Sequence, residues 1–354
     1  ILEEGFLGNM AQKLVETIIG CKTPSPIEVV EHLNTVLRSR ICLLDGRMER
    51  PIEAANLQEE DYRGGLFKEY LMAGSDLIKT NTVNGAMLPQ SMYDMGQRTR
   101  DLVYEMNKRG AEVAKRAAAE ITKEQPHKPR FVAGAIGVGA GGDEWNQVAV
   151  YQQQVQGLLD GGADMLLIES IHNSAACKAA MAAIEQRCRQ TNRDTPPIIL
   201  CTCFDSAGRN LADESIDEFL TSMRRDSCNW AFAIGINCAD GAEAHYRQLS
   251  QESHCWSQLA AYAEDVEGFC QIVAATSEGV GINFVGGHGT PPCHIEALYK
   301  SIEKFSVREL AASPKIVSKA FPTAKTFIIP ASTLSDDTVA NALGSSLWSD
   351  IGPL

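Results

Sequence analysis

The chain has 354 residues, of which 44% are hydrophobic and 22% are charged, and its formal net charge is −13 at pH 7. This composition is typical of a globular protein that is long enough for one large domain with additional terminal segments. The acidic balance argues against a nucleic-acid partner, because phosphate binding requires a basic face. The longest apolar runs have only the length of strands, so the sequence predicts no membrane span.

The eleven cysteines are scattered along the chain, without a CxxC pair or the spacing of a small disulfide-linked scaffold. We therefore expect buried, reduced thiols in an intracellular protein, in the cytoplasm or in mitochondria. The first residue is Ile rather than Met, which is compatible with the removal of a targeting peptide.

Helix and strand patterns alternate along most of the chain. Ser25-Pro26-Ile27-Glu28 has the pattern of a helix start, in which Ser25 caps the helix and Glu28 completes a capping box. The expected strands cover residues 41–44, 75–82, 130–137, 165–169, 198–203, 232–238, 257–262 and 282–288. The expected helices cover residues 10–19, 26–38, 67–72, 92–121, 148–159, 177–188, 215–223, 242–250, 266–276 and 292–305.

Eight strands, each followed by a helix, predict an α/β fold in which a parallel sheet closes into a (β/α)8 TIM-type barrel. A doubly wound sheet is the alternative, but no GxGxxG motif follows the first strand. The glycine-rich segment 137–142 is superficially similar to a phosphate loop but lacks its Lys-Ser/Thr end. We expect a helical N-terminal arm over residues 1–24, the barrel over residues 25–308 and an extended C-terminal arm over residues 309–354, with partial disorder of that arm as the alternative.

Several chemically capable side chains stand at the ends of expected strands. Cys238 and His288 each end an apolar strand and can bind a soft metal ion. The carboxyl ends of the strands of a parallel barrel meet at one face, the barrel mouth, where active sites are built. Asp45, Lys79, Glu169 and His288 should all point to the same face, where they could serve as acid–base groups. A carboxylate and Lys79 could equally form a buried ion pair there.

Short motifs spread over residues 26–305 occur in the order found in one enzyme family. They include Leu43-Leu44-Asp45-Gly46, Thr80-Asn81-Thr82, Leu167-Ile168-Glu169, Ile234-Gly235-Ile236-Asn237-Cys238 and Val285-Gly286-Gly287. On these motifs the chain resembles the homocysteine S-methyltransferase family, most closely the homocysteine-binding barrel of cobalamin-dependent methionine synthase. The resemblance implies a zinc ion that is held by three cysteine thiolates and activates the homocysteine thiol for methyl transfer.

The resemblance assigns roles to individual positions of this chain. Asp45, Gly46 and Glu169 match the positions that hold the amino acid, and Cys238 matches the first zinc ligand. The adjacent cysteine pair that should follow the last Gly-Gly is absent, and His288 stands there instead.

Cys293, near the start of the following helix, is a further candidate ligand. Other departures are the bulky segment Arg47-Met48-Glu49-Arg50 after the first strand, Lys79 in place of a glutamate, and three shortened strand-to-helix loops.

Three functional hypotheses follow from these departures. The first is a catalytically inactive structural or scaffolding subunit with a degenerate zinc-thiolate site, no bound cofactor, and protein partners contacted through residues 1–24 and 313–354. The second is a divergent zinc-dependent methyltransferase that converts homocysteine to methionine with Cys238, His288 and Cys293 as ligands. The third is a small-molecule sensor, or a different enzyme, that reuses the barrel mouth.

Overall fold

The structure, a computed structural model, describes residues 12–46, 64–86, 97–137, 148–205, 208–225, 231–238, 256–260, 284–288 and 291–301. The helices expected at 242–250 and 266–276, the C-terminal arm at 309–354 and the segment Arg47-Met48-Glu49-Arg50 lie outside these residues.

Eight parallel strands form one sheet in the order β1-β8-β7-β6-β5-β4-β3-β2. They are β1 (Cys42–Leu43), β2 (Leu77–Lys79), β3 (Phe131–Gly137), β4 (Met165–Ile171), β5 (Ile198–Phe204), β6 (Ala233–Cys238), β7 (Trp256–Ala260) and β8 (Phe284–His288). The two ends of this order meet at a parallel bridge between Leu44 and Leu77. Asp45 N–H donates to the Leu77 carbonyl (3.1 Å), and Asp76 N–H donates to the Leu43 carbonyl (2.8 Å). These bonds connect β1 to β2, as closure of the predicted TIM-type barrel requires.

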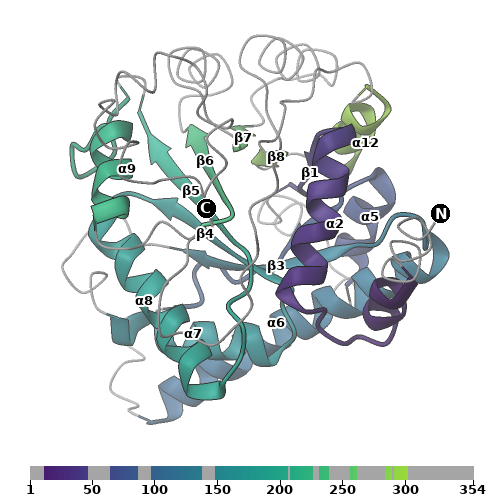
Figure 1. The fold of residues 1–354 in the computed structure, drawn as a ribbon, viewed down its shortest axis with the longest axis horizontal. Helices are drawn as coiled ribbons and strands as arrows, with labels where there is room; N and C mark the ends of the chain where they lie inside the picture. Colours follow the sequence, from purple (N-terminus) through teal and green to yellow (C-terminus); the bar gives the residue numbers. More distant parts are fainter. Residues whose placement is uncertain are drawn as a thin grey trace, which may run out of the picture.

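Helices surround the strands (Figure 1). They are α2 (Pro26–Ser39), α5 (Gly65–Ala73), α6 (Gln97–Glu124), α7 (Val148–Asp160), α8 (Ser174–Thr191), α9 (Ile216–Arg225) and α12 (Pro292–Ser301), and residues 12–19 are also helical. Consecutive helices pack side by side from α5 to α9, and α12 packs against α5. Among the described helices, none has both the length and the apolar character needed to cross a membrane.

Two helix starts illustrate how local sequence sets the element boundaries. The capping box predicted for α2 is present, because Glu28 N–H donates to Ser25 Oγ and Ser25 N–H donates to the Glu28 carboxylate. Helix α8 begins three residues earlier than expected. Its cap is Asn173, whose side-chain oxygen accepts the N–H of Ala176 at 2.7 Å, a role for which asparagine is among the preferred residues.

Strand β2 is shorter than the expected range 75–82, because two threonine hydroxyls replace main-chain groups in the hydrogen bonds to β3. The Thr80 hydroxyl accepts the N–H of Ala135 (2.8 Å), and the Thr82 hydroxyl donates to the carbonyl of the same residue (2.7 Å). A turn follows, in which Gly85 N–H donates to the Thr82 carbonyl. The motif Thr80-Asn81-Thr82 therefore directs the chain away from the sheet at the end of β2.

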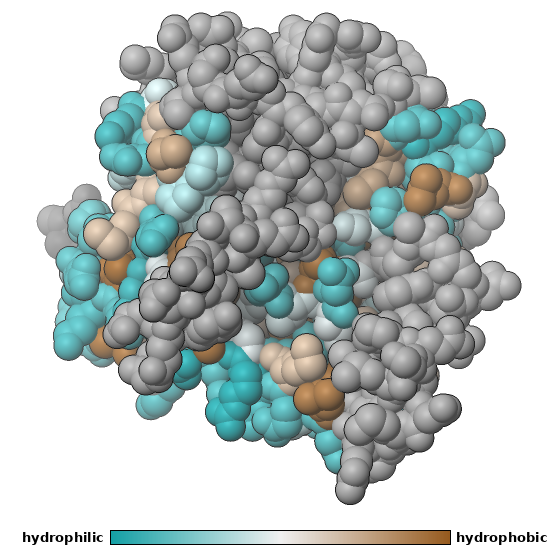
Figure 2. All heavy atoms as spheres, turned by 180° about the vertical axis from the view of Figure 1, so that it is seen from behind, coloured by the Kyte–Doolittle hydropathy of each residue, from teal (hydrophilic) through white to brown (hydrophobic). Residues whose placement is uncertain are grey.

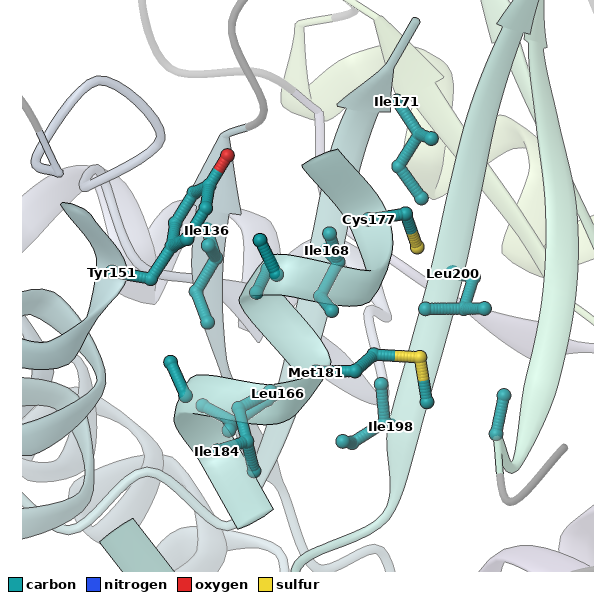
Figure 3. Close-up of a cluster of buried hydrophobic side chains, with 14 of the residues drawn as sticks. Ile136, Tyr151, Leu166, Ile168, Ile171, Cys177, Met181, Ile184, Ile198 and Leu200 are labelled. Atoms are coloured by element: carbon teal, nitrogen blue, oxygen red, sulfur yellow. The ribbon is translucent and has the colours of Figure 1, made fainter. Parts of the chain in front are cut away.

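The apolar core has an inner and an outer part. The inner part fills the amino-terminal end of the barrel, where Leu77, Met165 and Phe284 from the strands cluster with Leu33 of α2 and Ile18 of the preceding helix. The described portion of the N-terminal arm is thus packed onto the barrel floor. The outer part lies between the strands and the surrounding helices. Figure 3 shows its segment around β3, β4, β5 and α8.

On the face shown in Figure 2, the described residues are mainly hydrophilic, with separate hydrophobic patches. The large apolar side chains that are exposed in this part of the chain are Met72, Leu102, Met106, Leu211 and Tyr299. Isolated apolar side chains of this kind are normal on globular proteins.

Candidate ligand site at the barrel mouth

The alternation of side chains along β2 and β4 directs two charged groups into the barrel. Leu77 on β2, and Met165 and Leu167 on β4, belong to the inner cluster. Lys79 and Glu169 follow these residues at intervals of two and therefore share their inward direction, one step closer to the mouth. Both side chains are almost fully buried, at 4% and 2% exposure.

Asp45 follows β1 and is completely buried. Its Oδ2 accepts the main-chain N–H of Lys79 at 3.0 Å, which fixes the carboxyl group against the end of β2. Burial raises the pKa of Asp45 to about 7; the positive charge of Lys79 and its N–H bond oppose this rise, and the negative charge of Glu169 adds to it. Asp45 is therefore electrostatically coupled to both inward-pointing charges.

Each of these three side chains has a polar atom with an unused hydrogen-bonding position. Asp45 Oδ1, Lys79 Nζ and Glu169 Oε2 are all buried and have no hydrogen-bond partner among the residues that the structure describes. The buried ion pair weighed from the sequence is not formed by Lys79, whose Nζ makes no salt bridge within that same part of the chain. Leaving buried polar groups unpaired costs free energy, so such a cluster needs an explanation.

The backbone next to Glu169 is irregular. Ser170 has a φ of 58°, in the left-handed region that residues with a side chain seldom adopt, and the pairing of β4 with β5 shifts register between Ile168 and Ile171. Bulges of this kind reorient a side chain and occur often beside active sites. Here the bulge directly follows Glu169.

The segment after β2 crosses the end of β3 close to this bulge. Gly137, the last residue of β3, is paired in register with Glu169 and donates its N–H to the Val83 carbonyl at 2.8 Å. A Cβ on Gly137 would lie only 2.2 Å from that carbonyl oxygen. The close approach of the two backbones therefore requires glycine at this position.

The two strand-end metal candidates are placed by their backbones. Cys238 is the last residue of β6 and His288 is the last residue of β8, and β7 lies between the two strands. Two strand spacings separate these backbones by about 10 Å. The directions of these two side chains lie outside what the structure describes.

The remaining candidates are placed as follows. Gly46 is buried directly after Asp45. Cys293 is exposed in the first turn of α12. It is close enough to Tyr70 of α5 to help raise the pKa of that phenol, which burial, Asp45 and Glu69 also raise.

Comparisons with known proteins identify the family. The sequence model described as homocysteine S-methyltransferase matches residues 42–302, from β1 to the end of α12. This chain belongs to the homocysteine S-methyltransferase family. The match covers more than half of the chain and leaves out α2, which contributes to the barrel floor.

Solved structures of the *Escherichia coli* homocysteine methyltransferase MmuM have a similar fold. Its oxidized form shows 22% identity and a TM-score of 0.56, with coverage of 78% of this chain and 99% of that chain. The metallated form shows 21% identity and a TM-score of 0.55, with the same coverage. At this level of identity the likeness supports the fold.

The family implies zinc, and the described donors do not form a complete site for it. Within the described residues, no group of three or more His, Cys, Asp or Glu side chains could hold a metal ion. Cys293, the third candidate ligand, is exposed on α12. A structural or catalytic zinc site requires at least three protein ligands, and the side chains of Cys238 and His288 lie outside the described residues.

Sequence reasoning missed two features of the mouth. The left-handed Ser170 has no sequence signal, since glycine or asparagine would be the expected residue there. Tyr70, fully buried on α5 and coupled to Asp45, was expected only as part of a short helix. Its position in the apolar face of that helix indicates burial but not its proximity to a carboxyl group.

Proposed function

We propose that this chain is a homocysteine S-methyltransferase-like barrel with a degenerate zinc-thiolate site, which acts as a catalytically inactive structural or scaffolding subunit of a larger assembly. The observation that supports this proposal is the sequence at the end of β8. Gly286-Gly287 is followed by one imidazole and a glycine, where two adjacent thiolates are expected. Without those thiolates the barrel has no complete ligand set with which to bind and deprotonate a homocysteine thiol.

The proposed partner contacts lie in residues 313–354 of the C-terminal arm and at the beginning of the N-terminal arm. Residues 12–19 already use Leu14 and Ile18 to cover the barrel floor, so their outer face and the preceding residues are left for a partner.

The test is the native mass in extracts of the source cells, compared for the full chain and a chain without residues 313–354. The full chain should elute well above its own 38.4 kDa, and the truncated chain should elute as a smaller species. Elution of both as monomers would contradict a scaffolding role.

A second candidate function is a divergent zinc-dependent methyltransferase. The observation in its favour is that Cys238 and His288 end two strands separated only by β7, so their backbones are about 10 Å apart, a span that two side chains can bridge through one metal ion. Cys293 would have to supply the third ligand.

Metal content distinguishes the two functions. The inactive barrel predicts substoichiometric zinc in protein purified without chelator, and no change on Cys238→Ser. About one zinc per chain that is lost in Cys238→Ser, together with methyl transfer to homocysteine that depends on Cys238, would overturn the scaffolding proposal.

A further inference from the structure

We propose that the loop between β5 and α9 binds a partner subunit, and that Leu211 at its tip enters an apolar pocket of that subunit with a basic rim. The loop covers residues 208–215 and is separate from the two arms of the chain. The inference rests on the proposed scaffolding function, because it names a further surface through which the assembly would be joined.

Leu211 is the most exposed large apolar side chain in the described part of the chain, at 68%. The exposure of one leucine is ordinary by itself, so the loop that carries it decides whether the side chain can act as an anchor. A loop that must first become ordered loses conformational entropy when a partner binds, whereas a fixed loop has already lost it.

The backbone of the loop is closed on itself. Arg209 and Ser215 form an antiparallel bridge at its base. Above the bridge, the Asn210 N–H donates to the Glu214 carbonyl at 3.0 Å, and the Asp213 N–H donates to the Asn210 carbonyl at 2.9 Å. The loop is therefore a tight turn with a defined shape rather than an extended connection.

The side chain of Asn210 fixes the tip from inside. It is only 6% exposed, and its Oδ1 accepts the N–H groups of Ala212 at 3.0 Å and Glu214 at 2.9 Å. Its Nδ2 donates to Glu214 Oε2 at 2.7 Å. Since both neighbours of Leu211 are held by these bonds, the position of the leucine backbone is set before any partner arrives.

The loop is also attached to the barrel. The Glu214 carboxylate accepts the N–H of Ser174 at 2.9 Å and its hydroxyl at 2.6 Å, at the first residue of α8. The Ala212 N–H lies 3.3 Å from the His172 carbonyl oxygen. These contacts prevent the tip from moving relative to the barrel and make it a rigid projection.

The turn contains a strained residue. Asp213 has a φ of 61°, and the Arg209 guanidinium holds it in place by donating to its carbonyl at 2.6 Å. Left-handed residues with a side chain persist where surrounding bonds impose them, and they are frequent at binding sites. A loop that only connected β5 to α9 would gain nothing from this strain, whereas a loop that presents a leucine gains a fixed geometry.

The charges around the tip define the partner. Residues 208–218 contain four acidic side chains and one guanidinium: Asp213, Glu214, Asp217, Glu218 and Arg209. The side chains of Asp213 and Glu218 are 91% and 61% exposed. A second copy of this chain, with its net charge of −13, would bring like charges together, which opposes association. A different protein with lysine or arginine around its pocket matches the loop.

The test compares native masses of tagged variants expressed in the source cells. Extracts are diluted in steps before size-exclusion chromatography, and the dilution at which half of the tagged chain has left the large species measures the relative affinity. Leu211→Asp should dissociate at a dilution at least about 10-fold lower than wild type, as expected for the loss of an interface anchor. Leu211→Ala should change it in the same direction by less. The control is Leu102→Asp, at an exposed position on α6, which should behave as wild type does.

Two further variants separate the frame of the loop from its charge. Asn210→Ala keeps the leucine but removes the bonds that fix it, so it should also weaken association. Asp213→Asn removes a charge and keeps a residue that tolerates the left-handed conformation. It should weaken association at about 0.1 M salt and approach wild type at about 0.5 M salt, where the charges are screened.

Cross-linking distinguishes a partner from the chain's own residues. Leu211 is replaced by a photoreactive diazirine analogue of leucine, and the extract is illuminated. We expect a cross-link to a second polypeptide that is lost on dilution in parallel with the large species. A cross-link confined to this chain would show that the chain covers its own leucine, and would overturn the inference.

The failure of this inference can be told from the failure of the scaffolding function. If removal of residues 313–354 dissociates the assembly but Leu211→Asp leaves it as stable as wild type, the scaffolding function stands and the loop is not an interface. Equal weakening by Leu211→Asp and Leu102→Asp would also overturn the inference. A wild-type chain that elutes as a monomer at every dilution would contradict both proposals.

Discussion

The Asp45 carboxylate is hydrogen-bonded to the main chain of Lys79 and not to its ammonium group. Asp45 Oδ2 accepts the Lys79 N–H at 3.0 Å, while Lys79 Nζ forms no salt bridge in the described part of the chain. The bond orients the carboxyl group, and the unpaired ammonium group remains beside it. This arrangement gives the mouth both a fixed carboxyl group and an unpartnered positive charge.

The first prediction concerns the pH dependence of stability. Burial raises the pKa of Asp45 to about 7 in the folded chain, well above its value in an unfolded chain. The folded state therefore binds more protons between about pH 4 and pH 7, and the contribution of Asp45 to stability is lost as pH rises through this window. Asp45→Asn removes this loss and keeps an acceptor for the Lys79 N–H. Its free energy of unfolding relative to wild type should increase by up to about 4 kcal/mol from pH 4 to pH 7.

Denaturant unfolding at several pH values measures this difference. Lys79, Glu169 and Tyr70 interact with Asp45 and are unchanged in the variant, so the difference between the two proteins reports Asp45 together with its coupling to these neighbours. Asp205→Asn, at an exposed position after β5, serves as the control and should follow wild type at every pH. If the free energy of unfolding changed with pH in the same way for Asp45→Asn and wild type, the pKa of Asp45 would not be raised in the folded chain.

The second prediction concerns Ser170. Glycine tolerates a φ of 58° without steric cost, so Ser170→Gly should raise the free energy of unfolding by about 1 kcal/mol. Asn192→Gly is a matched control, because Asn192 ends α8 with a φ of 50° and lies away from the mouth. Both variants should be at least as stable as wild type by denaturant unfolding. A destabilised Ser170→Gly would indicate that the serine makes contacts that outweigh the strain.

Much of the fold could be predicted from the sequence, because its signals are local and repeated. The capping box at Ser25 and the strand expected at residues 165–169 are patterns within short segments, and both agree with the structure, in which β4 is buried at all but one position. The early end of β2 depends on hydroxyl bonds from Thr80 and Thr82 to Ala135 on another strand. A pattern confined to one segment does not contain that information.

The candidate site was predictable only in part, for a similar reason. The inward direction of Lys79 and Glu169 follows from strand periodicity once the strands are known. Whether Lys79 forms an ion pair depends on distances between three strands, and the structure was needed to show that it forms none with the described residues. The left-handed conformation of Ser170 is imposed by the pairing of β4 with β5 and contradicts the residue's own preference.

The third prediction concerns an ion pair away from the mouth. Lys115 Nζ of α6 lies 2.6 Å from Asp164 Oδ1, both side chains are buried, and Asp164 Oδ2 accepts the N–H of Val132. Lys115→Met should reduce the free energy of unfolding by about 3–5 kcal/mol, because it leaves a buried carboxylate without its partner. Lys123→Met on the same helix is exposed and should change it by no more than about 0.5 kcal/mol. Equal losses of unfolding free energy in Lys115→Met and Lys123→Met would show that the buried ion pair does not stabilise the folded chain.

The fourth prediction tests the crossing of the segment after β2 over the end of β3. The Cβ of Gly137→Ala would lie 2.2 Å from the Val83 carbonyl oxygen, so the two backbones would have to separate and the Gly137 N–H bond would be lost. We expect a loss of at least about 2 kcal/mol in the free energy of unfolding, combining the strain with the lost bond.

Gly208→Ala is the control for this variant. Gly208 has a φ of 75°, and an added Cβ would meet nothing within 4 Å, so the change tests conformational strain without a clash. It should cost about 1 kcal/mol. If Gly137→Ala were as mild as Gly208→Ala, the segment after β2 would be free to move away from β3, and the short contact with the Val83 carbonyl would not require glycine at position 137.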